Sequence, residues 1–270
     1  MILLKMKIVF NQYFTFIFLS TFLVPTFMFA QPEESKSSLS ACIIENAQQL
    51  NGSPYVAGTL EAAGPERLVY FKDKFDCVTF VEYVLALSIY QAGNTQNKTF
   101  EAILQQLRYR HGKIDGYGSR LHYFSEWILE NEKNGFIQNI TPKISSSPYK
   151  KNIRFMTSNA PKYPPFTDKK ELKKVSLAEH RISDYTWNYI PKSKINHISD
   201  QILSGDIIAI TTDIKDLDFV HTGFAIRTED GVHLLHASES EGKVVISKKT
   251  LYDYLKSHKH QSGIMILRVK

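Results

Sequence analysis

The spacing of apolar residues changes along the chain, from a helical period in the first half to short strand-like runs in the last third. Apolar positions three and four residues apart are typical of helices with one buried face. They predict helices over 43–50, 77–90, 99–109 and 124–131. Short apolar runs bounded by turn residues predict strands over 68–71, 207–211, 219–226, 232–238, 243–247 and 264–269. Helices first and antiparallel strands last indicate an α+β fold.

Residues between about 140 and 200 show less apolar periodicity and are rich in proline and lysine. One helix is predicted near 169–182, where lysine pairs would form the solvated face. We interpret about 110–200 as an insertion in a single domain that spans 43–270. The polar stretch 31–42 predicts a disordered linker before that domain.

The first thirty residues have the pattern of an export signal. A positive start precedes a long apolar run, and the small residue Ala30 stands at a suitable cleavage point. A signal peptide over 1–30 implies an exported protein, periplasmic or secreted, with no membrane association after cleavage. The alternative is an uncleaved anchor, which Asn11, Gln12 and Pro25 within the run disfavour. No other stretch is apolar enough to span a bilayer.

The formal net charge is +6 for the full chain, and it falls to +4 when Lys5 and Lys7 leave with the leader. This mild excess is compatible with work near anionic polymers. No nucleic-acid partner is expected, because the basic residues do not form a face interleaved with aromatic ones. With only two cysteines, the chain has no disulfide framework.

A nucleophile is predicted at Cys77, where a loop turns into the apolar helix over 77–90. Asp76 is a suitable N-cap, because its carboxylate can accept hydrogen bonds from the free amides of the first turn. Those amides and the helix dipole favour an anion and would stabilise the thiolate of Cys77. The alternative is a cysteine that packs as a small buried hydrophobe, unless the chain also supplies a base and an orienting group.

Two histidines on neighbouring predicted strands can supply those groups. His221 lies in the run 219–226, and His236 lies in the next run, 232–238. Side chains on adjacent strands can meet, so one imidazole can bind the other. His221 would accept the proton of Cys77, and His236 would hold the ring and the tautomer of His221. His233 has the opposite strand parity from His236 and is expected to be structural.

Other roles for the two cysteines stay open at this level. Cys77 and the two histidines could bind zinc, although the closely paired ligands usual at zinc sites are missing, so no metal or other cofactor is expected. The segment Leu39-Ser40-Ala41-Cys42 is similar to a lipoprotein cleavage box but is distant from the apolar run. The sequence leaves three alternatives open for Cys42. It is lipidated, it is free in the first helix, or it is bridged to Cys77 in an oxidising compartment.

Five short motifs together resemble one known family. The segment Phe75-Asp76-Cys77-Val78-Thr79-Phe80-Val81 is similar to the D-C-S-G-F-V motif of the NlpC-type, papain-like cell-wall cysteine peptidases. The other four motifs stand in the family's order, as Gly52-Ser53-Pro54-Tyr55 for G-x-P-Y, Leu203-Ser204-Gly205-Asp206 for L-x-P-G-D, His221-Thr222-Gly223-Phe224-Ala225-Ile226 for H-V-G-I-Y-I, and His236-Ala237-Ser238 for H-A-S. The resemblance covers about residues 43–270.

The departures from that pattern indicate one branch. Val78-Thr79 replaces the usual Ser-Gly, and the gap between Cys77 and His221 is long. The polar aromatic stretch 108–123 resembles the N-acetylmuramoyl-L-alanine amidase-like branch, which carries a large insertion and cleaves the sugar–peptide junction of peptidoglycan. The resemblance implies a papain-like amidase with a Cys77, His221 and His236 triad and no cofactor. Its substrate would be peptidoglycan or released muropeptides.

Substrate contacts are expected from two parts of the chain. By the same resemblance, Tyr55 lies beside the nucleophile and supplies a hydrogen bond. In the glycine-rich stretch 108–123, we expect Arg120, His122 and Tyr123 to contact the substrate. A guanidinium suits the carboxylates of a stem peptide. The alternative for each of these residues is a surface loop held by its own hydrogen bonds.

Three other functions compete with the amidase. A γ-D-glutamyl-diamino-acid endopeptidase of the same fold would cut within the stem peptide. A catalytically silent cell-wall binding module would bind without turnover, which the Cys77, His221 and His236 set disfavours. A thiol acyltransferase acting on lipid is disfavoured because the mature chain shows no predicted membrane anchor.

Overall fold

The computed structural model describes residues 38–61, 64–93 and 98–270. The predicted signal peptide and most of the predicted linker lie outside these residues. The helices are α1 (Leu39–Gln49), α2 (Cys77–Gln91), α3 (Phe100–Arg108), α4 (Phe124–Lys133), α5 (Thr141–Ile144), α6 (Phe155–Ser158), α7 (Lys169–Asp184), α8 (Ile195–Ile198) and α9 (Leu251–Lys256). The strands are β1 (Ile137–Asn139), β2 (Pro148–Tyr149), β3 (Trp187–Asn188), β4 (Ile190–Pro191), β5 (Ile207–Thr212), β6 (Phe219–Thr228), β7 (Gly231–Ser238), β8 (Lys243–Thr250) and β9 (Gln261–Val269).

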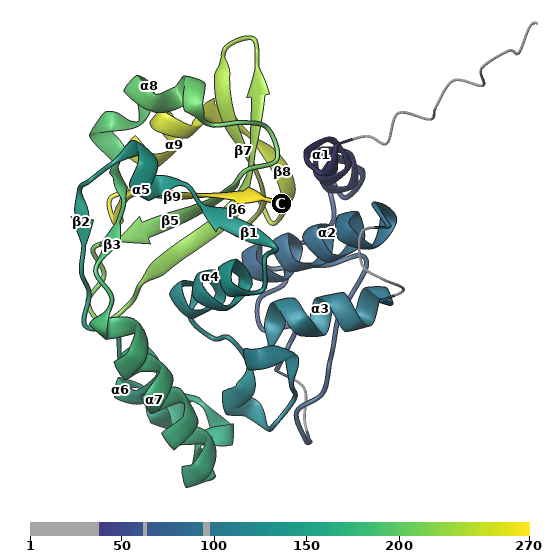
Figure 1. Ribbon diagram of the computed structural model, residues 1–270, viewed down its shortest axis with the longest axis vertical. Coiled ribbons are helices and arrows are strands. Elements are labelled where there is room, and N and C mark those ends of the chain that lie inside the picture. Colours follow the sequence, from purple (N-terminus) through teal and green to yellow (C-terminus); the bar gives the residue numbers. More distant parts are fainter. Residues whose placement is uncertain (1–37, 62–63, 94–97) are drawn as a thin grey trace, which may run out of the picture. The chain divides into compact units, whose positions relative to one another are not determined.

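One antiparallel sheet organises the domain (Figure 1). Its strands run in the order β1-β9-β5-β6-β7-β8, and β4 also pairs with β9. The predicted meander is present as β5 to β8. The predicted final strand pairs with β5, at the opposite edge of that meander from β8. The predicted α+β arrangement with an antiparallel sheet is therefore confirmed.

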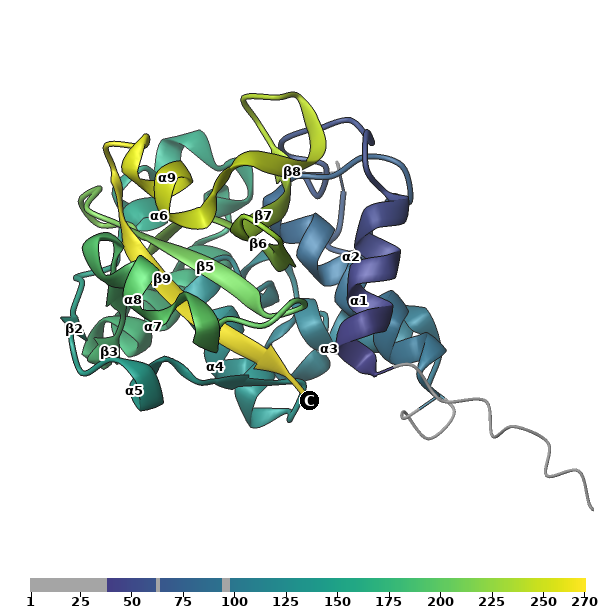
Figure 2. The ribbon, with the colours of Figure 1, turned by 90° about the horizontal axis from the view of Figure 1, so that it is seen from above.

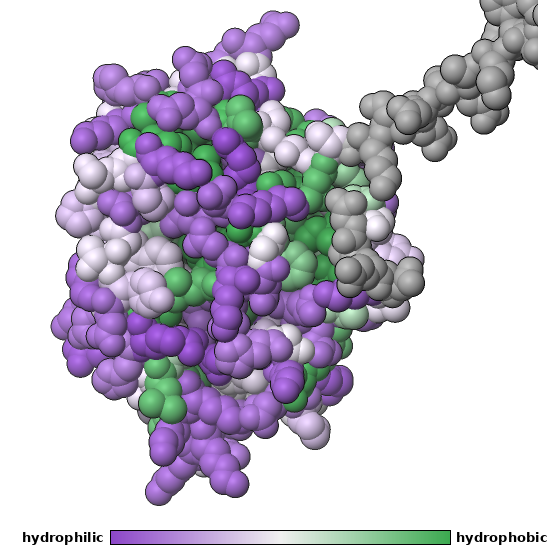
Figure 3. Space-filling model, viewed as in Figure 1, coloured by the Kyte–Doolittle hydropathy of each residue, from purple (hydrophilic) through white to green (hydrophobic). Residues whose placement is uncertain are grey.

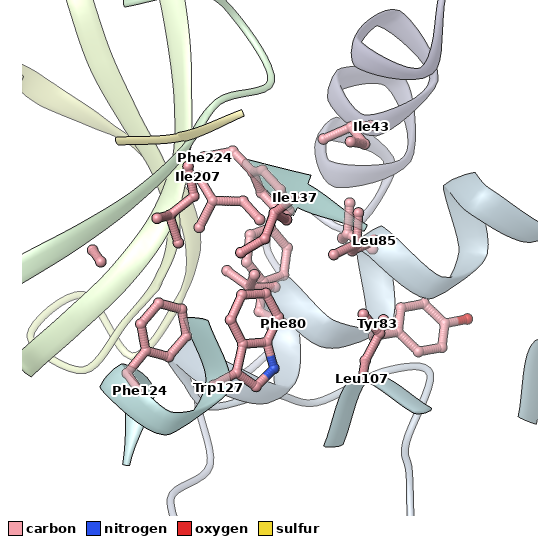
Figure 4. Close-up of a cluster of buried hydrophobic side chains, with 14 of the residues drawn as sticks. Ile43, Phe80, Tyr83, Leu85, Leu107, Phe124, Trp127, Ile137, Ile207 and Phe224 are labelled. Atoms are coloured by element: carbon pink, nitrogen blue, oxygen red, sulfur yellow. The ribbon is translucent and has the colours of Figure 1, made fainter. Parts of the chain in front are cut away.

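Alternate residues of the strands face two different helical layers. Ile207 and Ala209 of β5 belong to the large core shared with α1 to α4, whereas Ile208 and Ile210 belong to a second core with α8 and α9. This is the two-residue period of a strand buried on both faces. Figures 1 and 2 show α2 and α9 on opposite sides of the sheet. Figure 4 shows the large core, where Phe80 of α2 lies near Phe224 of β6.

The insertion contributes to three cores, and Ile140, Ile190 and Ile195 belong to the second core described above. Its first part, with α4 and β1, packs into the large core through Trp127 and Ile137. Its second part, with α6 and α7, has a separate cluster that includes Met156, Phe166 and Val175. α7 matches the predicted helix near 169–182 within two residues at its end. Only the α6–α7 part therefore behaves as an added lobe.

Three local predictions are corrected. α1 begins at Leu39, with Ser38 as its cap, so the predicted linker ends before residue 42. The stretch 68–71 forms no strand, and its Val69 carbonyl instead accepts a hydrogen bond from the Arg108 guanidinium. A Cys42–Cys77 bridge is absent, since both cysteines are free. Cys42 Sγ lies 3.2 Å from Gln91 at the far end of α2, about 20 Å along the helix from Cys77.

The polar and apolar residues of one face of the molecule are seen in Figure 3. The face shown in Figure 3 is mainly hydrophilic, with scattered apolar residues. In the described part of the chain, no helix has the length and apolar character needed to cross a bilayer.

Candidate active site

Cys77 is the first residue of α2, as predicted. The Asp76 carboxylate accepts a hydrogen bond from the Thr79 N–H at 2.8 Å, and the Thr79 hydroxyl accepts one from the Asp76 N–H at 2.9 Å. This reciprocal capping box fixes the start of the helix and hence the position of Cys77. The body of α2 is buried, so the thiol stands on a rigid support.

The thiol of Cys77 is neutral at rest, although backbone amides surround it. The N–H groups of Thr222, Val78 and Cys77 itself favour the thiolate. Burial, followed by the negative charge of Asp76, outweighs them and raises the pKa of Cys77 to about 12. The helix N-terminus therefore favours the thiolate, as predicted, but burial has the larger effect on the pKa of Cys77. A base must remove the proton during the reaction.

Strands β6 and β7 are not paired next to Cys77, and this local separation of the two strands positions two histidines. β6 pairs with β5 through residues 219–224 but with β7 only from Phe224 onwards. Continuing this register sets Gly223 opposite His236, with His221 as the diagonal neighbour on the same face. A Cβ at Gly223 would lie 2.8 Å from the His236 Cβ, so glycine allows the close approach.

The two predicted histidines are in direct contact. His221 Nε2 lies 2.6 Å from His236 Nδ1, and the ring planes are 83° apart. Tyr254 of α9 packs on both rings. Burial, and then the neighbouring His236 and His258, lower the pKa of His221 to about 3. Burial and His258 lower the pKa of His236 to about 4. Both rings are thus neutral near pH 7, so each offers one donor and one acceptor.

Cys77 and His221 line a single cleft of about 340 Å³. Most of the other lining side chains are aromatic or apolar, and two are carboxylates. They are Glu61, Val78, Tyr117, His122, Tyr123, Phe124, Phe155, Met156, Tyr163, Leu217, Asp218, Phe219, Val220 and Thr222. The cleft therefore joins the start of α2, the first half of β6 and the α6–α7 lobe.

Tyr55 lies near Cys77 but is not part of the cleft lining. Its backbone N–H donates to the Gly242 carbonyl at 2.9 Å, which holds the loop against the sheet. Burial, followed by the charges of Cys77 and Glu239, raises the pKa of the Tyr55 hydroxyl above its usual range. The hydroxyl stays protonated and can donate a hydrogen bond. The bond to substrate that the resemblance implied remains a prediction.

The Arg120 guanidinium is surrounded by acceptors of its own chain. It binds both oxygens of Glu66, at 3.0 and 2.8 Å, and one oxygen of Glu61 at 2.7 Å. A fourth N–H donates to the Leu60 carbonyl at 3.1 Å. These partners hold the pKa of Arg120 above its usual range despite burial. The group therefore binds Leu60, Glu61 and Glu66, and its contact with a stem peptide remains a prediction.

The predicted substrate-binding residues His122 and Tyr123 both line the cleft. They differ in which of their polar atoms are free to bond to a substrate. The Tyr117 carbonyl accepts a hydrogen bond from His122 Nε2 at 2.8 Å, which leaves Nδ1 as an acceptor. Burial and the charge of Arg120 lower the pKa of His122 to about 3. The Tyr123 hydroxyl donates to Glu179 and accepts from the Met156 N–H, so it ties the α6–α7 lobe to the domain. Its ring alone faces the cleft.

Several lining residues escaped the sequence prediction. Glu61, Tyr163 and Asp218 come from three distant segments, and no spacing along the chain connects them. Tyr254 lies on the six-residue helix α9, which was not predicted. In the described residues, no group of three or more His, Cys, Asp or Glu side chains is arranged to hold a metal ion.

Known proteins resemble the chain over most of its length. The sequence profile of the AmiA-like family, described as N-acetylmuramoyl-L-alanine amidase-like, matches residues 45–264. An N-acetylmuramoyl-L-alanine amidase from Bacteroides uniformis is 39% identical, with a TM-score of 0.80 over 86% of this chain and 99% of that one. A chain from Bacteroides fragilis, described as a candidate xylanase, is 38% identical, with a TM-score of 0.78 over 83% and 99%. A Legionella pneumophila protein is 25% identical, with a TM-score of 0.64 over 86% and 89%. No curated protein matches the chain.

Proposed function

The chain belongs to the AmiA-like, N-acetylmuramoyl-L-alanine amidase-like family, and on this premise we propose a cysteine amidase that cleaves the bond between N-acetylmuramic acid and L-alanine. The observation that carries the proposal is the shared cleft. It brings the Cys77 thiol and the His221 imidazole together, with His236 bonded behind His221. A nucleophile and a base thus line one cleft, and an orienting group is bonded to the base.

The reaction begins with proton transfer, because the thiol and both imidazoles are neutral at rest. His221 accepts the proton of Cys77 as the sulfur attacks the lactyl carbonyl carbon of the muramic acid. The new S–C bond gives a tetrahedral intermediate with a negative oxygen. The amide N–H of Cys77, at the start of α2, and the Tyr55 hydroxyl are the donors that would stabilise that oxygen.

Cleavage and hydrolysis follow in two steps. His221 returns its proton to the alanine nitrogen, the C–N bond breaks, and the peptide leaves with a free amino group. The lactyl group remains as a thioester on Cys77. Water then attacks this thioester with His221 as base, which releases the muramic acid carboxylate and restores the thiol.

The wider assignment also belongs to this proposal. A nucleophilic cysteine at the start of a buried helix, packed on an antiparallel sheet that carries the base, supports a papain-like arrangement of the NlpC type. The substrate would be peptidoglycan or released muropeptides, which an exported protein can reach. Cell fractionation with antibody detection tests export, and a fully cytoplasmic protein would contradict it.

The decisive experiment uses residues 31–270 with N-acetylmuramoyl tripeptide and tetrapeptide, read by mass spectrometry. We expect free peptide beginning with L-alanine, and no product from Cys77→Ala. Asn152→Ala serves as a matched surface control and should leave the product yield unchanged. Release of a muramoyl dipeptide would instead assign the γ-D-glutamyl endopeptidase.

A glycoside hydrolase is the second activity to test, because a neighbour is described as a candidate xylanase. Glycosidases need two carboxyl groups free to act on the scissile bond. The cleft carboxylates are both engaged, Glu61 by Arg120 and Asp218 by Ser125 and the Phe219 N–H. We therefore expect no reducing sugar from xylan, and its release by both wild type and Cys77→Ala would favour the glycosidase.

A further inference from the structure

A second cavity lies behind the histidine pair. It has a volume of about 370 Å³ and is formed by the end of β7, β8 and α9. His236 lines this back pocket but not the front cleft, whereas His221 lines the front cleft but not the back pocket. The pair therefore bridges two separate cavities.

The back pocket carries unpaired positive charge. Lys243, Lys248 and Lys249 line it, and none of them forms a salt bridge with a residue in the described ranges. Glu241 is the carboxylate in the same lining. Lysine ammonium groups that face a common cavity raise the local concentration of anions.

A buried donor completes the pocket. His236 is only 1% exposed, and its Nδ1 is bonded to His221. Its other nitrogen, Nε2, has no hydrogen-bond partner among the residues that the structure describes. Since His236 borders the back pocket and not the front cleft, Nε2 has the back pocket as its open side. A ring nitrogen that has no partner inside the protein and lies on a residue lining a cavity is free to bond to a ligand in that cavity.

The tautomers that catalysis requires make this atom a donor, a step that rests on the proposed function. If His221 Nδ1 accepts the Cys77 proton, His221 Nε2 carries hydrogen and donates to His236 Nδ1. Neutral His236 must then carry its own hydrogen on Nε2. The chain of hydrogen bonds then ends in an N–H of a residue that lines the same cavity as the three lysines.

We propose that the back pocket binds a small anion, a carboxylate or a phosphate group, which accepts the His236 Nε2–H and is held by Lys243, Lys248 and Lys249. The bound anion fixes the tautomer of His236 and, through it, the orientation of His221. It thereby completes the triad from the side opposite the substrate. His236 is a positioning residue in this arrangement, and the anion is an added fourth member.

Direct binding tests the proposal without any substrate. The protein labelled with ¹⁵N-histidine is titrated with inorganic phosphate and, separately, with acetate at constant ionic strength set by chloride. We expect a saturable shift of the His236 Nε2 resonance in at least one titration, and the stronger titration identifies the anion class. Lys248→Ala/Lys249→Ala should weaken that binding about tenfold, because two charge contacts are lost. The matched control, Lys170→Ala/Lys173→Ala on α7, removes two exposed lysines elsewhere and should leave binding unchanged.

Two outcomes would overturn the anion site. One is a His236 Nε2 resonance that does not respond to either anion in the folded wild-type protein. The other is equal weakening in both double variants, which would reduce the effect to general charge screening. If binding is found but the muramoyl peptides are not cleaved, the anion site stands and the amidase proposal fails.

A kinetic measurement then links the site to the reaction. At constant ionic strength, the binding anion should raise kcat with little change in KM, because it acts on His221 and not on the substrate. The double variant Lys248→Ala/Lys249→Ala should lose this stimulation, whereas the control Lys170→Ala/Lys173→Ala should keep it. An unchanged kcat across the binding range would contradict the positioning role.

Discussion

The histidine pair and the Arg120 cluster, which comprises Arg120, Glu61 and Glu66, each contribute one residue to the cleft lining, His221 and Glu61, but only the contact between the histidines was predicted from the sequence. The histidines meet because strand register fixes which residues share a face. Arg120 is held by its own carboxylates, at distances of 2.7 to 3.0 Å. The alternation of a strand thus predicts which face a side chain occupies. The partner of a charged side chain depends instead on segments that are distant in the sequence and meet only in the folded chain.

The largest expected effect is a loss of activity, and it concerns the histidine pair. His221→Ala should lower kcat/KM by about 10⁴-fold, because the neutral Cys77 thiol then has no base. His236→Ala should lower it less, by about 10²-fold, because the base remains but its tautomer is free. Both are measured with the muramoyl peptide assay. Near-normal activity of His221→Ala would remove this residue from the mechanism.

The second effect concerns stability. Arg120→Ala should lower the free energy of unfolding by about 3 kcal/mol, because it leaves the buried Glu66 carboxylate unpaired. Arg154→Ala is the matched control, since that arginine is 51% exposed and its pair with Asp216 should contribute less than about 1 kcal/mol. Urea unfolding measures both. A folded Arg120→Ala protein with unchanged stability and a raised KM would support the predicted substrate contact.

A smaller effect should follow from the one close approach that joins the histidines. Gly223→Ala would force a Cβ to within 2.8 Å of His236 and shift that ring. Misplacement by about 1 Å should lower kcat/KM by about 10²-fold. Gly135→Ala is the control, because its Cβ meets nothing within 4 Å and the site is distant, although its φ of 78° strains an alanine. Equal losses of activity in both variants would point to general destabilisation.

Much of the fold could be predicted from the sequence, because long regular elements show a regular spacing of apolar residues. Short elements do not show this spacing. α2, α3 and α7 and the strands β5 to β8 follow from apolar spacing, since each buries a regular face. The nucleophile position follows from a local cap at Asp76. Short elements such as β1 and α9 carry too few residues to show a period. Glu61, Tyr163 and Asp218 meet only in three dimensions, so no spacing along the chain could reveal their shared cleft.

The smallest effect tests the protonation state of the histidine pair. An unfolded histidine has a pKa of about 6.5, and burial lowers the pKa of folded His221 to about 3. Between these values the unfolded chain binds more protons, so the free energy of unfolding should rise with pH and be lost as the pH falls. His221→Gln should reduce that slope by at most about 1.4 kcal/mol per pH unit between pH 4 and 6. The exposed His180→Gln serves as the control and should keep the wild-type slope. Urea unfolding at several pH values gives both slopes. If the slope of His221→Gln equals that of wild type, the pKa of His221 is not lowered by burial in the folded protein.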